Sequence, residues 1–160
     1  MNREPTNKKF MADHMLGSLA RWLRMMGYDC RYEKGLADDD IIDICEKENR
    51  ILLTRDEELA TKSKGFCLRT TSLDEQLLEV SRSLDLKFNP SNMRCSLCNG
   101  PLVRIDRDKA AAEGGVPQRS LDIATEFWQC DSCKKIYWNG THWDGILGRF
   151  KRLGLAGDDE

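Results

Sequence analysis

The chain has 160 residues, of which 40% are hydrophobic and 32% charged, a composition typical of a globular protein rather than a disordered segment. A net charge of −2 and a pI of about 5.8 exclude a strongly basic global field. No apolar run approaches the roughly 18 residues that span a bilayer, and the first ten residues lack the apolar core of a secretory signal. We therefore expect a soluble, cytoplasmic protein without a membrane segment and with reduced cysteines.

The first half of the chain alternates between short β-like runs and helical periods. The pattern predicts strands at 9–12, 28–32, 51–54 and 66–69, and helices over 16–26, from 38, over 56–62 and over 73–84. Gly27 is suited to end the first helix, and Asp38 to cap the second. Helices of this length between strands imply β-α-β crossovers, so we expect an α/β fold with a mainly parallel sheet.

Two C-x-x-C motifs, Cys95–Cys98 and Cys130–Cys133, follow a turn-rich linker around Pro90. Four thiolates at this spacing form a tetrahedral metal site, so the motifs predict a structural zinc ribbon. Aromatic, β-prone residues flank the second motif and predict strands there. The remaining cysteines are expected to be core thiols: Cys30, Cys45 and Cys67.

The second half is also expected to contain a short helix around Ala110–Ala112 and a last helix with an apolar face that includes Ile146 and Phe150. We expect three parts: an α/β domain at 9–88, a zinc ribbon at 93–145, and a C-terminal helix and tail at 146–160.

Three acidic residues follow the predicted strands of the first half: Asp13, Asp38 and Asp56. Loops at the carboxyl ends of adjacent parallel strands converge on one crevice, where three carboxylates would repel one another unless a cation lay between them. Mg²⁺ and Mn²⁺ prefer such oxygen ligands, and the chemistry this suggests is metal-assisted phosphodiester hydrolysis. The alternative is that each Asp caps the helix that follows it.

Basic residues accompany these acids. Arg21 and Arg24 share a side of the first predicted helix with Asp13 and Gly17, and Arg55 precedes Asp56. The three arginines are candidate phosphate ligands, with Gly17 leaving room for the substrate. Alternatively, Gly17 permits close helix packing, the helix arginines face solvent, and Arg55 pairs with an acid.

Several segments together resemble a known family. They are Asp13–Arg24, Gly27–Asp29, Arg50–Leu59, Cys95–Leu102, Phe127–Cys133 and Tyr137–Trp143. Over roughly residues 9–145 the chain is similar to the PIN-like ribonuclease family named for the C-terminal domain of the Mut-seven exonuclease. The resemblance implies a PIN-like α/β fold with a C-terminal zinc ribbon, and a metal-dependent nuclease site acting on RNA.

Carried over by position, the resemblance makes Asp13, Asp38 and Asp56 the catalytic acids, with Asp39 a rival to Asp38. A fourth acid is usual in PIN-like enzymes, and Asp74 and Glu75 are the weak candidates here. For the zinc, His142 is an alternative ligand that four well-spaced cysteines make unnecessary.

Three functions follow from these observations. The leading one is a Mg²⁺- or Mn²⁺-dependent ribonuclease in which the ribbon helps to bind RNA. The second is a non-catalytic RNA-binding module, with Trp138 and Trp143 of the ribbon as stacking surfaces. The third is a protein-interaction adaptor. An inhibitory or other protein partner would leave no signature in the sequence.

Overall fold

The structure is a computed structural model that describes residues 8–156. Residues 1–7 and 157–160 lie outside this range. They include the end of the predicted C-terminal tail and most of the N-terminal segment in which a secretory signal was sought. The chain divides into two compact units, Met1–Asn99 and Gly100–Glu160.

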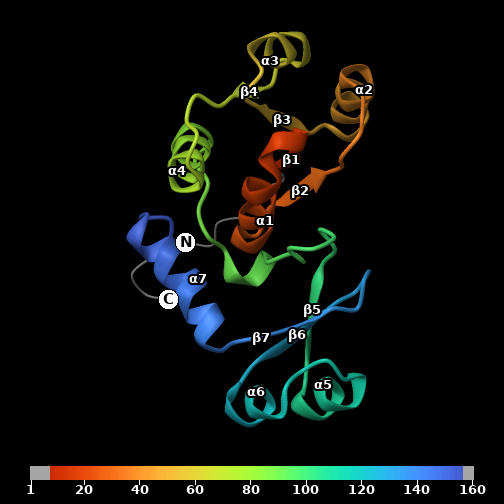
Figure 1. Cartoon of the computed structure of the whole chain (residues 1–160), viewed down its shortest axis with the longest axis vertical. Coiled ribbons are helices and arrows are strands. Elements are labelled where there is room, and N and C mark those ends of the chain that lie inside the picture. The colour runs from red at the N-terminus through yellow and green to blue at the C-terminus, as the bar shows by residue number, and fades with distance from the viewer. Residues whose placement is uncertain (1–7, 157–160) are drawn as a thin grey trace. The chain divides into compact units, whose positions relative to one another are not determined.

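The first unit is built on a four-stranded sheet (Figure 1). Its strands are β1 (Lys9–Ala12), β2 (Asp29–Tyr32), β3 (Ile51–Thr54) and β4 (Phe66–Cys67). All pairs are parallel, and the order across the sheet is β2-β1-β3-β4. Met11 of β1 lies opposite Arg31 on one side and Leu52 on the other. The predicted α/β fold with a parallel sheet is therefore confirmed.

Helices flank this sheet. They are η1 (His14–Leu16), α1 (Gly17–Met26), α2 (Asp38–Glu48), α3 (Glu57–Ser63), α4 (Leu73–Leu84) and the short η2 (Pro90–Asn92). Ile41 and Cys45 of α2 and Leu59 of α3 pack against Met11 and Leu52, so α2 and α3 cover one face. On the other side, α1 packs against β1, β2 and α4.

Helices α1 and α3 each begin one residue later than predicted, and the N-cap of α2 also differs from the prediction. A 3-10 turn with Asp13 as its N-cap precedes α1, which begins only at Gly17. The second helix has Ala37, not Asp38, as its N-cap, so the predicted capping role of Asp38 is wrong. Asp38 instead lies in the first turn of α2 with Asp39 and Asp40, where negative charge is favourable beside the positive end of the helix dipole. Gly27 ends α1 as predicted, in the left-handed conformation with φ 109°.

The second unit contains a three-stranded antiparallel sheet of order β5-β6-β7. Its elements are β5 (Leu102–Ile105), α5 (Arg107–Glu113), α6 (Gln118–Ile123), β6 (Phe127–Cys130), β7 (Ile136–Trp138) and α7 (Thr141–Arg152). Ala110 and Leu121 of α5 and α6 pack with Phe127 and Ile136 on one face of the sheet. The strands predicted beside the second C-x-x-C motif are confirmed, as are α5 and α7, whereas β5 and α6 were not predicted.

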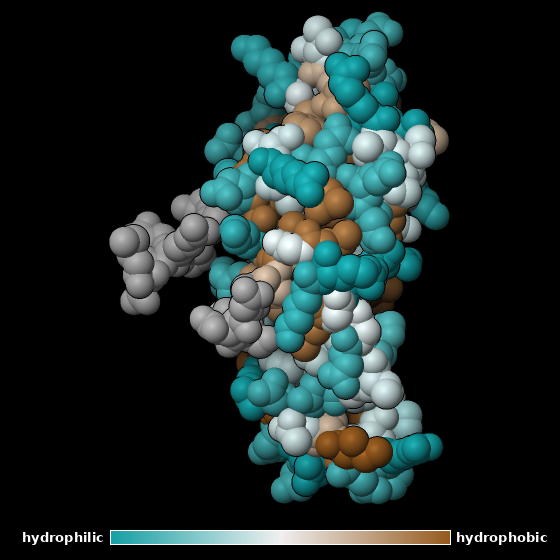
Figure 2. Space-filling view, turned by 90° about the vertical axis from the view of Figure 1, so that its left-hand side faces the viewer, coloured by the Kyte–Doolittle hydropathy of each residue, from teal (hydrophilic) through white to brown (hydrophobic). Residues whose placement is uncertain are grey.

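Hydrophilic side chains cover most of the face drawn in Figure 2. Among the described residues, the large apolar side chains that are strongly exposed are Met15, Leu97, Val103 and Ile123. Within residues 8–156, no helix has the combination of length and apolar character needed to cross a bilayer.

Candidate functional site

Asp13 directly follows β1 and is held by contacts on both carboxylate oxygens. Its backbone N–H donates to the carbonyl of Leu53 at 3.0 Å, which fixes the end of β1 beside β3. Oδ1 accepts the backbone N–H of His14 at 2.7 Å and lies 3.0 Å from His14 Nδ1. Oδ2 accepts the hydroxyl of Thr54 at 2.8 Å. Because the residue is only 8% exposed, these contacts set the direction of its carboxylate.

Thr54 connects Asp13 to Asp56. Thr54 is fully buried at the end of β3, and its Oγ1 donates to Asp13 while it accepts the backbone N–H of Asp56 at 3.0 Å. Asp56 then caps α3, since its Oδ1 accepts the N–H groups of Glu58 and Leu59 at 3.0 and 3.2 Å. One hydrogen-bonded chain therefore joins the two acids across neighbouring strands.

This chain lies at the topological switch point of the sheet. The strand β2 lies on one side of β1, and the next strand in the chain, β3, lies on the other side of β1. Strand order therefore reverses between β1 and β3, and ligands of open α/β sheets bind outside the carboxyl ends of the strands at such a point. Asp13 and Asp56 follow those two strands.

Capping and ligand binding are compatible at these two residues. Asp13 caps η1 and Asp56 caps α3, so the capping alternative is confirmed for both. Both cap bonds of Asp56 fall on Oδ1 alone. Capping fixes the orientation of each carboxylate without removing its negative charge.

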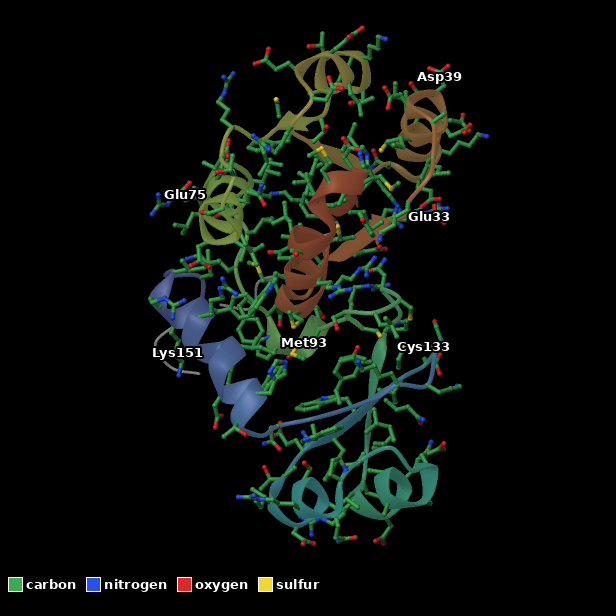
Figure 3. The ribbon with its side chains drawn as sticks, viewed as in Figure 1. Glu33, Asp39, Glu75, Met93, Cys133 and Lys151 are labelled. Carbon is green, nitrogen blue, oxygen red and sulfur yellow. The ribbon has the colours of Figure 1, made fainter. Side chains whose placement is uncertain are left out.

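The other candidate acids occupy separate places. Asp38 is exposed in the first turn of α2, and Figure 3 labels its rival Asp39 on the same helix. Asp74 and Glu75 lie in the first turn of α4, where the backbone N–H of Glu75 donates to the Ser72 hydroxyl. Among residues 8–156, these acids do not form a group of three ligands with Asp13 and Asp56 that is close enough to share an ion.

The arginines differ in their surroundings. Arg24 is 5% exposed, and its Nε and Nη1 donate to the carbonyls of Cys30 and Ser96 at 2.8 and 2.9 Å, so these two donors are engaged within the fold. Arg21 and Arg55 are exposed, and their proposed contact with phosphate stays a prediction. Gly17 faces Tyr32: a Cβ added there would lie 3.1 Å from the tyrosine hydroxyl. Close packing therefore accounts for this glycine.

The four cysteines of the two C-x-x-C motifs come together. The Sγ atoms of Cys95, Cys98, Cys130 and Cys133 all lie within 4.8 Å of one another. Figure 3 shows Cys133 in the loop between β6 and β7. Cys95 and Cys130 are buried, whereas Cys98 and Cys133 are exposed. Four sulfur donors at this separation fit a tetrahedral structural zinc site, and the group does not include His142.

Both C-x-x-C turns have the same backbone geometry. The N–H of Asn99 donates to the carbonyl of Cys95 and the N–H of Lys134 to that of Cys130, at 2.8 and 3.0 Å, and both donor residues have positive φ. In the second turn, Sγ of Cys130 accepts the N–H groups of Ser132 and Cys133 at 3.4 Å. A Cβ on Gly100 would lie 2.7 Å from that sulfur. The positive φ after each motif and the N–H groups directed at a cysteine sulfur both suit turns whose sulfur atoms bind a metal.

Sequence reasoning missed two residues of these sites. Thr54 was expected only as the end of a strand. Its position two residues before Asp56 could have indicated that its hydroxyl bonds residues at the ends of two neighbouring strands. The side chain of Asn99 contacts residues about 70 positions away, and such contacts carry no signal in the sequence.

Comparison with known protein families gives a match. The family model described as Mut7-C RNAse domain matches residues 8–150. No match was found among curated proteins or among solved structures. Because the match covers the parallel sheet, the acids at its switch point and all four cysteines, the chain belongs to the Mut7-C RNAse domain family.

Proposed function

We propose that this protein is a Mg²⁺- or Mn²⁺-dependent ribonuclease of the PIN-like type, with its reaction centre at the ends of β1 and β3. The observation that carries the proposal is the hydrogen-bonded chain Asp13–Thr54–Asp56 at the switch point. The buried Thr54 hydroxyl fixes the Asp13 carboxylate and the backbone at Asp56, and such support is what a site needs when the direction of its carboxylates matters. Membership of a ribonuclease family makes RNA the expected substrate.

The donor set suits a hard divalent ion. Asp13 and Asp56 would supply carboxylate oxygens, and water and the RNA phosphate would complete the coordination, because within residues 8–156 Asp38 and Asp39 do not form a ligand group with them. Such an ion, when bound, would activate water and stabilise the charge that develops on the phosphate. The residues of the chain would hold the two carboxylates in place: Thr54 and His14 orient Asp13, while the amides of α3 orient Asp56. The exposed Arg21 and Arg55 would contact phosphates of the RNA.

The second unit would help to bind RNA, with zinc holding the four cysteines as a closed structural site. Arg104, Trp128 and Tyr137 are cross-strand neighbours on β5, β6 and β7, on the sheet face opposite that of Phe127 and Ile136. Trp143 lies beside Trp128 with ring centroids 5.7 Å apart. Aromatic rings next to positive charge are typical of surfaces that bind single-stranded nucleic acid. The same rings favour the second candidate function, RNA binding without cleavage.

A cleavage assay on RNA and DNA with Mn²⁺ tests the proposal, using wild type, Asp13→Asn and Asp56→Asn. Asparagine is as good a helix cap as aspartate, and both cap bonds of Asp56 fall on one oxygen, so Asp56→Asn removes charge with little effect on folding. Asp13→Asn also gives up one of the two oxygens that accept hydrogen bonds, so its thermal unfolding is measured beside its activity. The matched control is Asp106→Asn, because Asp106 is also an N-cap whose side chain accepts a backbone N–H, that of Lys109, at the start of α5. We expect cleavage of RNA by wild type and the control, and a loss of roughly 100-fold or more in both site variants. Undiminished cleavage in both site variants would contradict the mechanism.

A further inference from the structure

The strand β2 lies at the edge of the parallel sheet, with β1 as its neighbour on one side. An edge strand presents backbone N–H and C=O groups that its own sheet does not pair. At Cys30, in the buried part of β2, side chains take both groups. The N–H donates to Asn99 Oδ1 at 3.1 Å, and the carbonyl accepts Arg24 Nε at 2.8 Å.

Both side chains lead to the first C-x-x-C turn. Asn99 is the residue directly after Cys98, and its positive φ of 71° turns the chain at the end of the motif. Arg24 also donates from Nη1 to the carbonyl of Ser96, between the two cysteines, at 2.9 Å. The carbonyl of Arg24 accepts the N–H of Arg94 at 2.9 Å. The segment Arg94–Asn99 is thus attached to α1 and β2 at several points.

Charge strengthens this attachment. Asn99 Nδ2 donates to Asp29 Oδ1 at 2.6 Å, and Arg50 Nη1 donates to the same oxygen at 2.8 Å. Burial alone would raise the pKa of Asp29, but the hydrogen bonds from Arg50 and Asn99 and the nearby arginine charges outweigh it, so the pKa is lowered. The carboxylate therefore stays ionised and holds Asn99 by a charge-assisted bond.

From this geometry we infer that the first C-x-x-C turn caps the edge of the sheet, with Asn99 as the positioning residue that couples zinc binding to the order of β2. A metal bound by the four cysteines fixes the turn, and the fixed turn presents Asn99 to Cys30 and Asp29. Coupling of this kind is reciprocal, so an ordered β2 also preorganises Cys95 and Cys98 for the metal. The inference does not depend on nuclease activity.

Hydrogen exchange of the full chain, zinc-loaded and after chelation, tests this coupling. We expect zinc removal to raise exchange in a peptide covering β2 by about 10-fold or more, in addition to the cysteine turns. The interior strand β3 is the internal reference and should stay protected. Unchanged protection of β2 would overturn the inference, and so would an equal loss in β2 and β3, because that result means global unfolding rather than a local edge contact.

The variant Asn99→Gly tests the reciprocal effect in the zinc-loaded protein. Glycine adopts the required positive φ without strain, so the substitution removes the side chain and spares the turn. We expect zinc affinity, measured by competition with a chelating dye, to fall about 10-fold, as is typical for residues that orient metal ligands. The control is Asn49→Gly, since Asn49 also has positive φ (56°) at the C-cap of α2. Equal zinc affinity in the two variants would refute the role of Asn99.

Discussion

Thr54 illustrates how a single buried hydroxyl organises the candidate site. Its Oγ1 donates to the Asp13 carboxylate and accepts from the backbone N–H of Asp56, so it connects the ends of β1 and β3, which the two acids follow. A buried hydroxyl needs both partners to offset its desolvation, and here both belong to the site. The residue acts through the two acids and is therefore a positioning residue rather than a ligand.

Replacing Thr54 with Val should test this role, because valine has nearly the same shape and lacks the hydroxyl. We expect a loss of about 1–3 kcal/mol in the free energy of unfolding, since the N–H of Asp56 and Oδ2 of Asp13 each lose a partner. Cleavage should fall through kcat, with KM little changed, and Thr54→Ser should restore most of it. Thr61→Val is the control: it removes an exposed hydroxyl bond on α3. If Thr54→Ser were no more active than Thr54→Val, the role of the hydroxyl would be contradicted.

The thiols of Cys30 and Cys45, which lie outside the zinc motifs, are protected from reaction by burial in the core of the first unit. Burial raises the pKa of Cys30 to about 12 and that of Cys45 to about 11, because a thiolate would lose its hydration in the core. In the unfolded chain these thiols ionise near pH 9. Their contribution to stability is therefore complete below pH 9 and declines as the pH rises from there toward 11–12.

Alkylation at pH 8 followed by peptide mass spectrometry should reflect this difference. We expect the half-buried Cys67 to react well before Cys30 and Cys45, which remain protonated and inaccessible in the native state. After chelation the exposed Cys98 and Cys133 should become reactive too. Modification of Cys30 as fast as Cys67 would show that the edge of the sheet opens more readily than its packing implies.

Among the elements, the interior ones are predicted most accurately from the sequence. The apolar run Ile51–Thr54 forms β3 with the predicted bounds, because it is paired on both sides and buried. By contrast, β5 alternates little in burial and α6 has only six residues, so neither carries a clear periodic signal. The N-cap of α2 was misplaced by one residue, since three consecutive aspartates are equally good first-turn residues.

The candidate site was predictable as far as topology alone determines it. The adjacency of Asp13 and Asp56 follows from strand order, because their strands are neighbours in the sheet. Asp38 differs because five residues separate β2 from α2, and the path of that connection determines where the acid lies. Contacts of Arg24 with Ser96 and of Asn99 with Cys30 join distant segments through single hydrogen bonds, which no local pattern encodes.

Loss of the metal should affect the elements of the chain unequally. In Cys98→Ser the site keeps three cysteines, and structural zinc sites with a missing ligand bind far more weakly. We expect limited proteolysis of this variant to cut within residues 93–140, while the interior strands of the first unit resist. Cys67→Ser, which alters a thiol outside the cluster, is the control and should retain both zinc and resistance. Loss of zinc without new cleavage sites would contradict a structural role of the metal.

At the scale of the whole molecule, the net charge constrains how RNA can bind. A chain with net charge −2 has no long-range attraction for a polyanion, and the candidate site itself carries carboxylates. In the proposed ribonuclease, the exposed Arg21 and Arg55 would therefore act together with a divalent cation that neutralises the acids. Under this proposal RNA binding and metal binding would be linked, whereas a binding module that uses only the second unit would not need the ion.

The linkage gives a test that separates the proposed enzyme from a non-catalytic module. The affinity of the wild-type protein for a cleavage-resistant RNA is measured at low salt, with Mn²⁺ and after removal of Mg²⁺ and Mn²⁺ but not of zinc. We expect Mn²⁺ to raise this affinity about 10-fold or more. Asp56→Asn should lose most of this gain, because one ligand of the ion is absent, and Asp106→Asn should keep it. Affinity should also fall with added salt, since phosphate contacts release counterions. Metal-independent affinity together with no cleavage of ordinary RNA would instead support the binding module, and no affinity at low salt would support an adaptor.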